Sequence, residues 1–129
     1  MNTDQMVFVF GSNEAGIHGA GAARFALEKR GAVRNVGFGP QGQSFAIPTK
    51  DWIIHTLPIQ VVKAYVDRFI AYAWRNNLEQ FQVTAIGCGL AGYAHKNIAP
   101  LFERAPDNCF FDEAWKPYLP DRQFWGTFE

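Results

Sequence analysis

The chain has 129 residues, a formal net charge of zero, and a composition of 48% hydrophobic and 19% charged residues. This length and composition predict one folded domain over residues 1–129 and exclude an intrinsically disordered chain. Without a block of lysine or arginine, the sequence argues against a protein that holds nucleic acid through its phosphates. No stretch is apolar for long enough to span a membrane, and the first residues lack a signal-peptide pattern, so we expect a cytoplasmic protein.

Short apolar runs that end at glycine, proline or polar residues predict four strands. These strands are expected at residues 6–10, 44–48, 81–86 and 108–111. Apolar residues spaced three and four apart predict three helices. The helices are expected at residues 19–30, 57–77 and 97–104, with Thr56 as the cap of the second. Strands that alternate with helices are typical of a mostly parallel mixed sheet covered on both faces, so the predicted fold is α/β with three layers, α/β/α.

The remaining segments carry weaker signals. Residues 33–43 are rich in glycine and are interpreted as a loop with a short strand near Val36. Residues 52–56 fit either a short strand or a loop. The aromatic C-terminal tail, residues 112–129, is expected to pack on the core, with a homodimer surface as the alternative. Cys88 and Cys109 are not spaced as a metal or redox pair, so we expect reduced thiols, no metal and no cofactor.

Two glycine-rich turns dominate the pattern. The first runs from Gly11 to Gly21 and the second from Gly87 to Tyr93, and each follows a predicted strand and precedes a predicted helix. In a parallel sheet both turns lie at the same edge, where ligands of open α/β sheets bind. Free N–H groups of such turns and of a helix N-terminus bind anions, and glycine lets the anion approach closely. The pair predicts a diphosphate site, although glycine also marks ordinary connections.

Polar residues near these turns are candidates for chemistry. His18 is suited to donate a hydrogen bond to a phosphate or to act as a general acid, the alternative being an exposed or packed loop residue. Glu14 is either an acid or base, or a solvated charge, and Lys50 either faces the phosphate or lies on the surface. For Cys88, a helix N-terminus would lower the pKa, but no histidine base is recognisable, which favours a small buried residue.

One aromatic residue is singled out for stacking on a base. Phe111 ends a predicted strand on the proposed ligand edge of the sheet. The alternative for Phe111, as for the other aromatic residues near the C-terminus, is packing in the core.

Three segments resemble macro domains, a family of modules that bind ADP-ribose. The sequence HGAGAA at residues 18–23, preceded by Asn13, resembles the first glycine-rich loop of that family. The sequence FQVTAIGCGLAGY at residues 81–93 resembles its second phosphate loop, and residues 45–58 are more loosely similar to the segment between them. The resemblance implies a macro-domain-like fold and a ligand that is ADP-ribose or a related nucleotide diphosphate.

The resemblance also implies roles for individual residues. Asn13 matches an asparagine that faces the distal ribose. The family's early aspartate, which recognises adenine, has no counterpart in residues 1–5. The ligand-binding positions of the two loops are Gly11, Ser12, Gly19, Ala20, Gly21 and Ala22 in the first, and Gly87, Cys88, Gly89, Leu90, Ala91, Gly92 and the closing aromatic Tyr93 in the second.

Three functions are compatible with these features. The first is binding of the nucleotide diphosphate with hydrolysis of an ADP-ribosyl ester or a terminal phosphate, in which Asn13, His18 and Glu14 are the catalytic residues. The second is a non-catalytic module that binds or sequesters a nucleotide-derived signal. The third is a structural or partner-binding protein in which the glycine turns are only turns.

Overall fold

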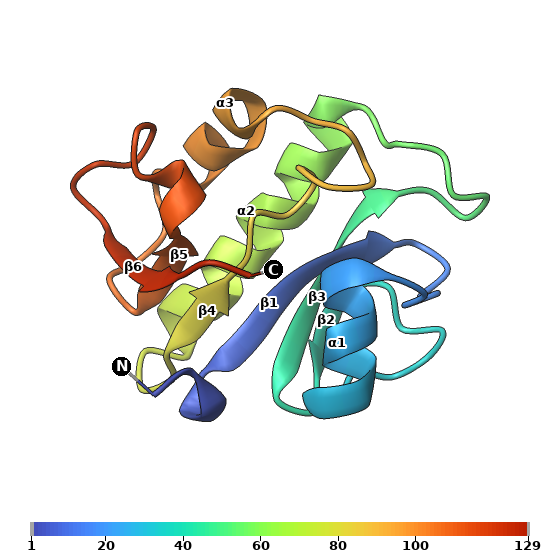
Figure 1. Cartoon of the computed structure of the whole chain (residues 1–129), viewed down its shortest axis with the longest axis horizontal. Coiled ribbons are helices and arrows are strands. Elements are labelled where there is room, and N and C mark those ends of the chain that lie inside the picture. Colours follow the sequence, from blue (N-terminus) through green and yellow to red (C-terminus); the bar gives the residue numbers. More distant parts are fainter. Residues whose placement is uncertain (1, 129) are drawn as a thin grey trace.

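The computed structural model describes residues 2–128 as an α/β protein built on one mixed sheet (Figure 1). The six strands lie in the order β2-β3-β1-β4-β5-β6. Only β2 runs antiparallel to its neighbour, β3, and the other pairs are parallel. The strands are β1 Val7–Asn13, β2 Gly39–Gln41, β3 Ser44–Lys50, β4 Phe81–Val83, β5 Cys109–Asp112 and β6 Gln123–Gly126. The predicted α/β class with a mostly parallel mixed sheet is confirmed.

Helices cover both faces of this sheet. The α-helices are α1 Gly21–Lys29, α2 Ile59–Arg75 and α3 His95–Ile98. Single turns of 3-10 helix are η1 Thr3–Gln5, η2 Ala99–Phe102 and η3 Glu113–Trp115. Within residues 2–128, no helix has the length and apolar character that a membrane crossing requires.

Alternating residues of the central strand separate the two layers of the core. Phe8 and Phe10 on β1 pack with the small residues of α1, among them Ala23 and Ala26. Val9, between them, points to the opposite face and belongs to the larger cluster formed with α2. This alternation follows from the strand, in which successive side chains point to opposite faces.

The chain changes direction beside β1. From β1 it passes through α1 to β2 and β3 on one side, and from β3 it passes through α2 to β4 on the other side of β1. The connections that follow β1 and β4 therefore leave the sheet toward opposite faces. In open α/β sheets a crevice forms at the carboxyl ends of the strands at such a point.

Several predicted boundaries differ from the structure, and β4 ends at Val83, before the predicted end at residue 86. The first strand does not end at Gly11 but continues to Asn13, because it pairs with β3 as far as Lys50. Glycine is needed at position 11, because a Cβ atom there would clash with Cγ2 of Ile86 at a distance of 2.7 Å. Helix α2 begins at Ile59 with Pro58 before it, and Thr56 does not cap it. The Thr56 hydroxyl instead donates to the carbonyl oxygen of Ala91, 3.0 Å away.

Other segments agree with the predicted elements only in part. The short strand in residues 33–43 lies at β2, later than the predicted position near Val36. Residues 52–56 form a loop, with one isolated bridge between Thr56 and Lys50. The aromatic tail contains an unpredicted strand, β6, which adds to the edge of the sheet. The third predicted helix is divided into α3 and η2.

Candidate functional site

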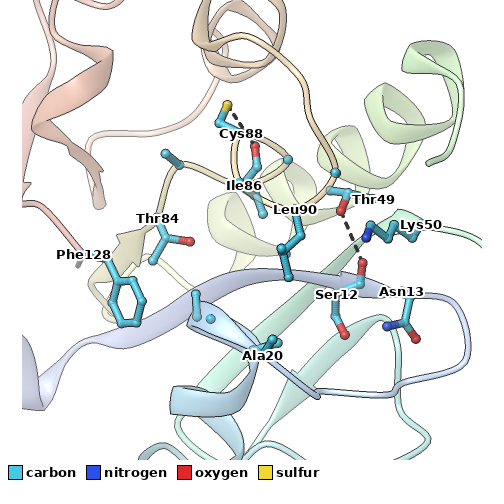
Figure 2. A pocket seen from close by; sticks show the side chains of 18 of the residues that line it. Ser12, Asn13, Ala20, Thr49, Lys50, Thr84, Ile86, Cys88, Leu90 and Phe128 are labelled. Atoms are coloured by element: carbon cyan, nitrogen blue, oxygen red, sulfur yellow. Dashed lines mark hydrogen bonds between the residues drawn. The ribbon is translucent and has the colours of Figure 1, made fainter. Parts of the chain in front are cut away.

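A cavity of about 560 Å³ lies at the carboxyl edge of the sheet, at this change of direction. Residues 19–23, at the start of α1, form one side, and residues 87–91, after β4, form the other. Residues 11–13 and 84–86 lie at the ends of the two strands between them. Figure 2 shows Leu90 reaching from the second turn toward Ala20 in the first. The two glycine-rich turns thus border one cavity, called the cleft below.

The first side of the cleft is the N-terminus of α1. Gly21 has a φ of +57°, a left-handed conformation that glycine adopts without strain. The first hydrogen bond of the helix is donated by Arg24 to the carbonyl oxygen of Ala20, at 3.3 Å. The N–H groups of residues 21–23 have no acceptor within residues 2–128. These are the unpaired donors that a helix N-terminus offers to an anion.

The second side is the loop after β4. Its backbone bonds to itself, since Tyr93 N–H donates to the Gly87 carbonyl at 2.9 Å and Gly92 N–H to that of Gly89 at 3.0 Å. The N–H groups of residues 89–91 have no acceptor in the described part of the chain. A Cβ atom on Gly89 would meet nothing within 4 Å, so the backbone is open there. Unpaired N–H groups therefore occur on both sides of the cleft.

Asn13 and Lys50 lie at one end of the cleft (Figure 2). The Asn13 side-chain amide donates to the carbonyl oxygen of Ile17 at 2.7 Å and accepts from the Ile17 N–H at 2.9 Å. An amide group has two N–H donors, so one remains for a ligand. Lys50, at the end of β3, pairs with no acidic residue between positions 2 and 128. This end combines a cation with an amide donor.

Phe128 lies at the opposite end of the cleft (Figure 2). Its ring packs on Phe8 and Phe25, with centroid distances of 5.7 and 5.4 Å. Its N–H donates to the carboxylate of Asp112 at 3.2 Å, and that carboxylate also accepts from Thr127 and Ala114. No motif in the sequence distinguishes Phe128 or Asp112, and only the aromatic character of the tail indicates Phe128.

His18 and Glu14 do not line the cleft. His18 is 2% exposed, and both ring nitrogens bond within the protein. The Glu14 carboxylate accepts from the Tyr65 hydroxyl on α2, 2.5 Å away. Burial, and then this hydrogen bond, raise the pKa of Tyr65 to about 12. The structure thus places only Asn13 of the three predicted catalytic residues at the cleft.

Three further predicted ligand contacts lie elsewhere. Phe111 is 0% exposed and packs against Phe102 and Trp115, so the prediction that it stacks on a base is wrong. Gly92 and Tyr93 are not among the lining residues, and the Tyr93 hydroxyl donates to the carbonyl oxygen of Leu57. The other predicted positions of both loops line the cleft: Gly11, Ser12, Gly19, Ala20, Gly21, Ala22, Gly87, Cys88, Gly89, Leu90 and Ala91.

Cys88 lines the cleft as a protonated thiol. Burial raises the pKa of this thiol to about 11. A thiol in this state is a poor nucleophile near neutral pH, because the thiolate is the reactive form. Cys88 and Cys109 are both free of disulfides. The structure therefore supports the interpretation of Cys88 as a small packed residue.

In the described residues, no group of three histidine, cysteine, aspartate or glutamate side chains is placed to hold a metal ion. Comparisons with protein-family models, curated proteins and solved structures gave no match to this chain.

Proposed function

We propose that the cleft binds ADP-ribose or a related nucleotide diphosphate, with the diphosphate between the two glycine-rich turns. The observation that carries this proposal is the presence of unpaired N–H groups on both sides of the cleft, at residues 21–23 and 89–91. Donors on two facing sides suit an anion with two charged groups better than a single phosphate on one helix.

The length of the cleft supports an extended ligand. Four lining residues mark the ends of strands that are consecutive in the sheet: Lys50 at the end of β3, Asn13 at the end of β1, Thr84 directly after β4 and Asp112 at the end of β5. Neighbouring strands are about 4.8 Å apart, so the ends of β3 and β5 are separated by roughly 14 Å. That span accommodates a diphosphate with a sugar on each side, within a cavity of about 560 Å³.

The two ends of the cleft differ in chemistry and orient the ligand. The aromatic ring of Phe128 offers a face on which a base stacks. Asn13 and Lys50, at the other end, offer donors to the hydroxyl groups of a distal ribose and to a phosphate oxygen. The resemblance of both loops and of Asn13 to macro domains supports the same orientation.

The residues that line the cleft favour binding without turnover. Cys88 is protonated, and the Asp112 carboxylate accepts hydrogen bonds from three groups of the chain. The Cys88 thiol is therefore no general base, and the Asp112 carboxylate holds the C-terminal tail in place. Hydrolysis of an ADP-ribosyl ester or a terminal phosphate stays a prediction of the sequence. Mass spectrometry of the ligand after prolonged incubation tests it, because a binding module returns the ligand unchanged.

Calorimetric titration with ADP-ribose and ADP tests the binding proposal. Gly89→Glu adds a carboxylate at a position with an ordinary φ and open space, so it should abolish binding without disturbing the fold. Leu78→Glu is the matched control, because Leu78 is 99% exposed and precedes β4 at the opposite edge of the sheet. Absence of binding by the unmodified protein at millimolar ligand, or full binding by Gly89→Glu, would refute the proposal.

A further inference from the structure

His95 is held in a single tautomer at the wall of the cleft. It begins α3 and lines the cleft beside the second glycine-rich turn. Its Nδ1 atom lies 3.1 Å from Nε1 of Trp115. An indole N–H only donates, so Nδ1 accepts and carries no proton. The neutral ring therefore has its proton on Nε2.

The support behind this ring is rigid. Trp115 is 0% exposed, and its ring packs on those of Phe102 and Phe111, with centroid distances of 5.2 and 6.0 Å. No acceptor within residues 2–128 bonds to Nε2 of His95. A half-buried histidine thus holds an unused N–H donor in the lining of the cleft.

This donor belongs to the end of the cleft that contains Phe128. Trp115 lies in η3, which follows β5 directly, and Asp112 at the end of β5 bonds to both η3 and Phe128. Hydrogen bonds therefore connect His95, through Trp115 and η3, to the end of β5 that also holds Phe128. Lys50 is the last residue of β3, which is separated from β5 by β1 and β4 in the sheet.

We propose that His95 selects for the base of the bound nucleotide, donating its Nε2 proton to a ring nitrogen or carbonyl oxygen of the base that stacks on Phe128. The inference rests on the proposed function and specifies how this chain recognises a base without the family's early aspartate. Because Trp115 holds the proton on Nε2, His95 acts as a hydrogen-bond donor and not as a general base. His95 is a binding residue in this role, and Trp115 is a positioning residue.

The test compares two ligands that differ only in the base. ADP and ribose 5-diphosphate are titrated into the unmodified protein, His95→Ala and His95→Gln, after thermal melting has confirmed that each variant folds. Loss of one hydrogen bond of about 1.4 kcal/mol weakens binding about tenfold. We expect His95→Ala to lose about tenfold in affinity for ADP and nothing for ribose 5-diphosphate. His95→Gln, whose amide offers an N–H at a similar reach, should recover part of the loss.

A spectroscopic measurement separates this role from a structural one. Nitrogen-15 NMR of the histidine rings should show His95 protonated at Nε2 alone, and ADP, but not ribose 5-diphosphate, should shift that signal. Trp115→Phe removes the indole donor and should allow the other tautomer. Equal affinities of His95→Ala and the unmodified protein for ADP, or an equal loss for both ligands, would overturn the inference and leave the proposed function standing. No binding of either ligand by the unmodified protein would overturn both.

Discussion

The side-chain oxygen of Ser12 lies 2.7 Å from Nδ1 of His18, and this bond joins the lining of the cleft to a buried histidine behind it. Nε2 of the same ring lies 2.8 Å from the carbonyl oxygen of Val33. A carbonyl oxygen only accepts, so Nε2 donates to it, and Nδ1 accepts from the Ser12 hydroxyl. His18 therefore connects the first glycine-rich turn to the segment after α1.

This connection predicts that His18 stabilises the fold. His18→Ala removes the hydrogen bonds of both ring nitrogens, among them a 3.2 Å contact of Nε2 with Oε1 of Gln41. It also removes the edge contact with Phe10, at a centroid distance of 5.2 Å. We expect the free energy of unfolding to fall by about 2–4 kcal/mol, measured by urea denaturation. His55→Ala, at an exposed histidine, is the control. A variant with unchanged stability but no turnover would instead identify His18 as a catalytic acid.

The raised pKa of Cys88 predicts that its reactivity depends on pH and can be used to detect ligand binding in the cleft. Because burial raises its pKa to about 11, alkylation by iodoacetamide should be slow at pH 7 and should accelerate as the pH approaches 11. A bound nucleotide diphosphate should slow the reaction, since Cys88 lines the cleft. Mass spectrometry follows the modification, with the buried Cys109 as an internal reference. Equal rates with and without a ligand that binds would place that ligand elsewhere.

The raised pKa of Cys88 also predicts how the free energy of unfolding changes at alkaline pH. The folded-state pKa of Cys88 lies above the ordinary value of 9.0, so the folded state disfavours the thiolate. Its contribution to stability is complete below pH 9 and is lost as the pH rises to about 11. Cys88→Ser should therefore reduce the alkaline loss of stability, measured by denaturation at several pH values. An unchanged pH profile in this variant would contradict the raised pKa.

Replacing Ile54, in the lining of the cleft, should increase the stability of the fold. It has a φ of +67°, an unusual conformation for a β-branched residue, and its side chain is 40% exposed. The neighbouring N–H groups of Ile53 and His55 both donate to the Asp51 carboxylate, which holds the loop in this conformation. Ile54→Asn should relieve about 1 kcal/mol of strain.

The matched control is Ile53→Asn, which exchanges the same residue types one position earlier, at a side chain that is 69% exposed. Ile53 is not among the residues with a positive φ. Thermal denaturation should show Ile54→Asn to be the more stable of the two variants. The reverse order would mean that the Ile54 side chain stabilises the loop by more than its backbone strains it.

Replacing Phe128 should lower the affinity only for ligands that carry a base. Phe128→Ala removes the aromatic face at one end of the cleft, and stacking on an aromatic side chain contributes about 1–3 kcal/mol per base. Affinity for ADP should therefore fall, measured by calorimetry, while affinity for ribose 5-diphosphate stays the same. Phe128→Tyr keeps the ring and should retain most of the affinity. A uniform loss for both ligands would indicate that Phe128 only supports Phe8 and Phe25.

The sequence predicted those parts of the fold that local patterns determine. The amphipathic run of α2 and the apolar runs of β1 and β3 are visible without tertiary contacts, and two glycine turns after parallel strands must meet at one edge. β2 has only three residues, with Pro40 at its centre, and its pairing depends on β3. β6 lies among aromatic residues without alternation and forms by pairing with β5.

The individual site residues were harder to predict than the loops. The buried His18 bonds to the carbonyl oxygen of Val33, 15 residues later, and no local sequence pattern predicts such a partner. The end of a predicted strand indicates Phe111 as a ligand contact, but η2 and η3 cover it with Phe102 and Trp115. Phe128 reaches the cleft because the Asp112 carboxylate accepts from its N–H, a contact that depends on the unpredicted β6.

The position of Phe128 also decides how this protein should be handled. The described chain begins before β1, at the amino end of that strand (Figure 1), whereas residue 128 lines the cleft at the carboxyl edge of the sheet. A tag or surface linkage attached after Phe128 would start beside the place proposed for the base. Attachment ahead of Thr3 leaves the cleft open, so binding experiments should immobilise the protein through its N-terminal side.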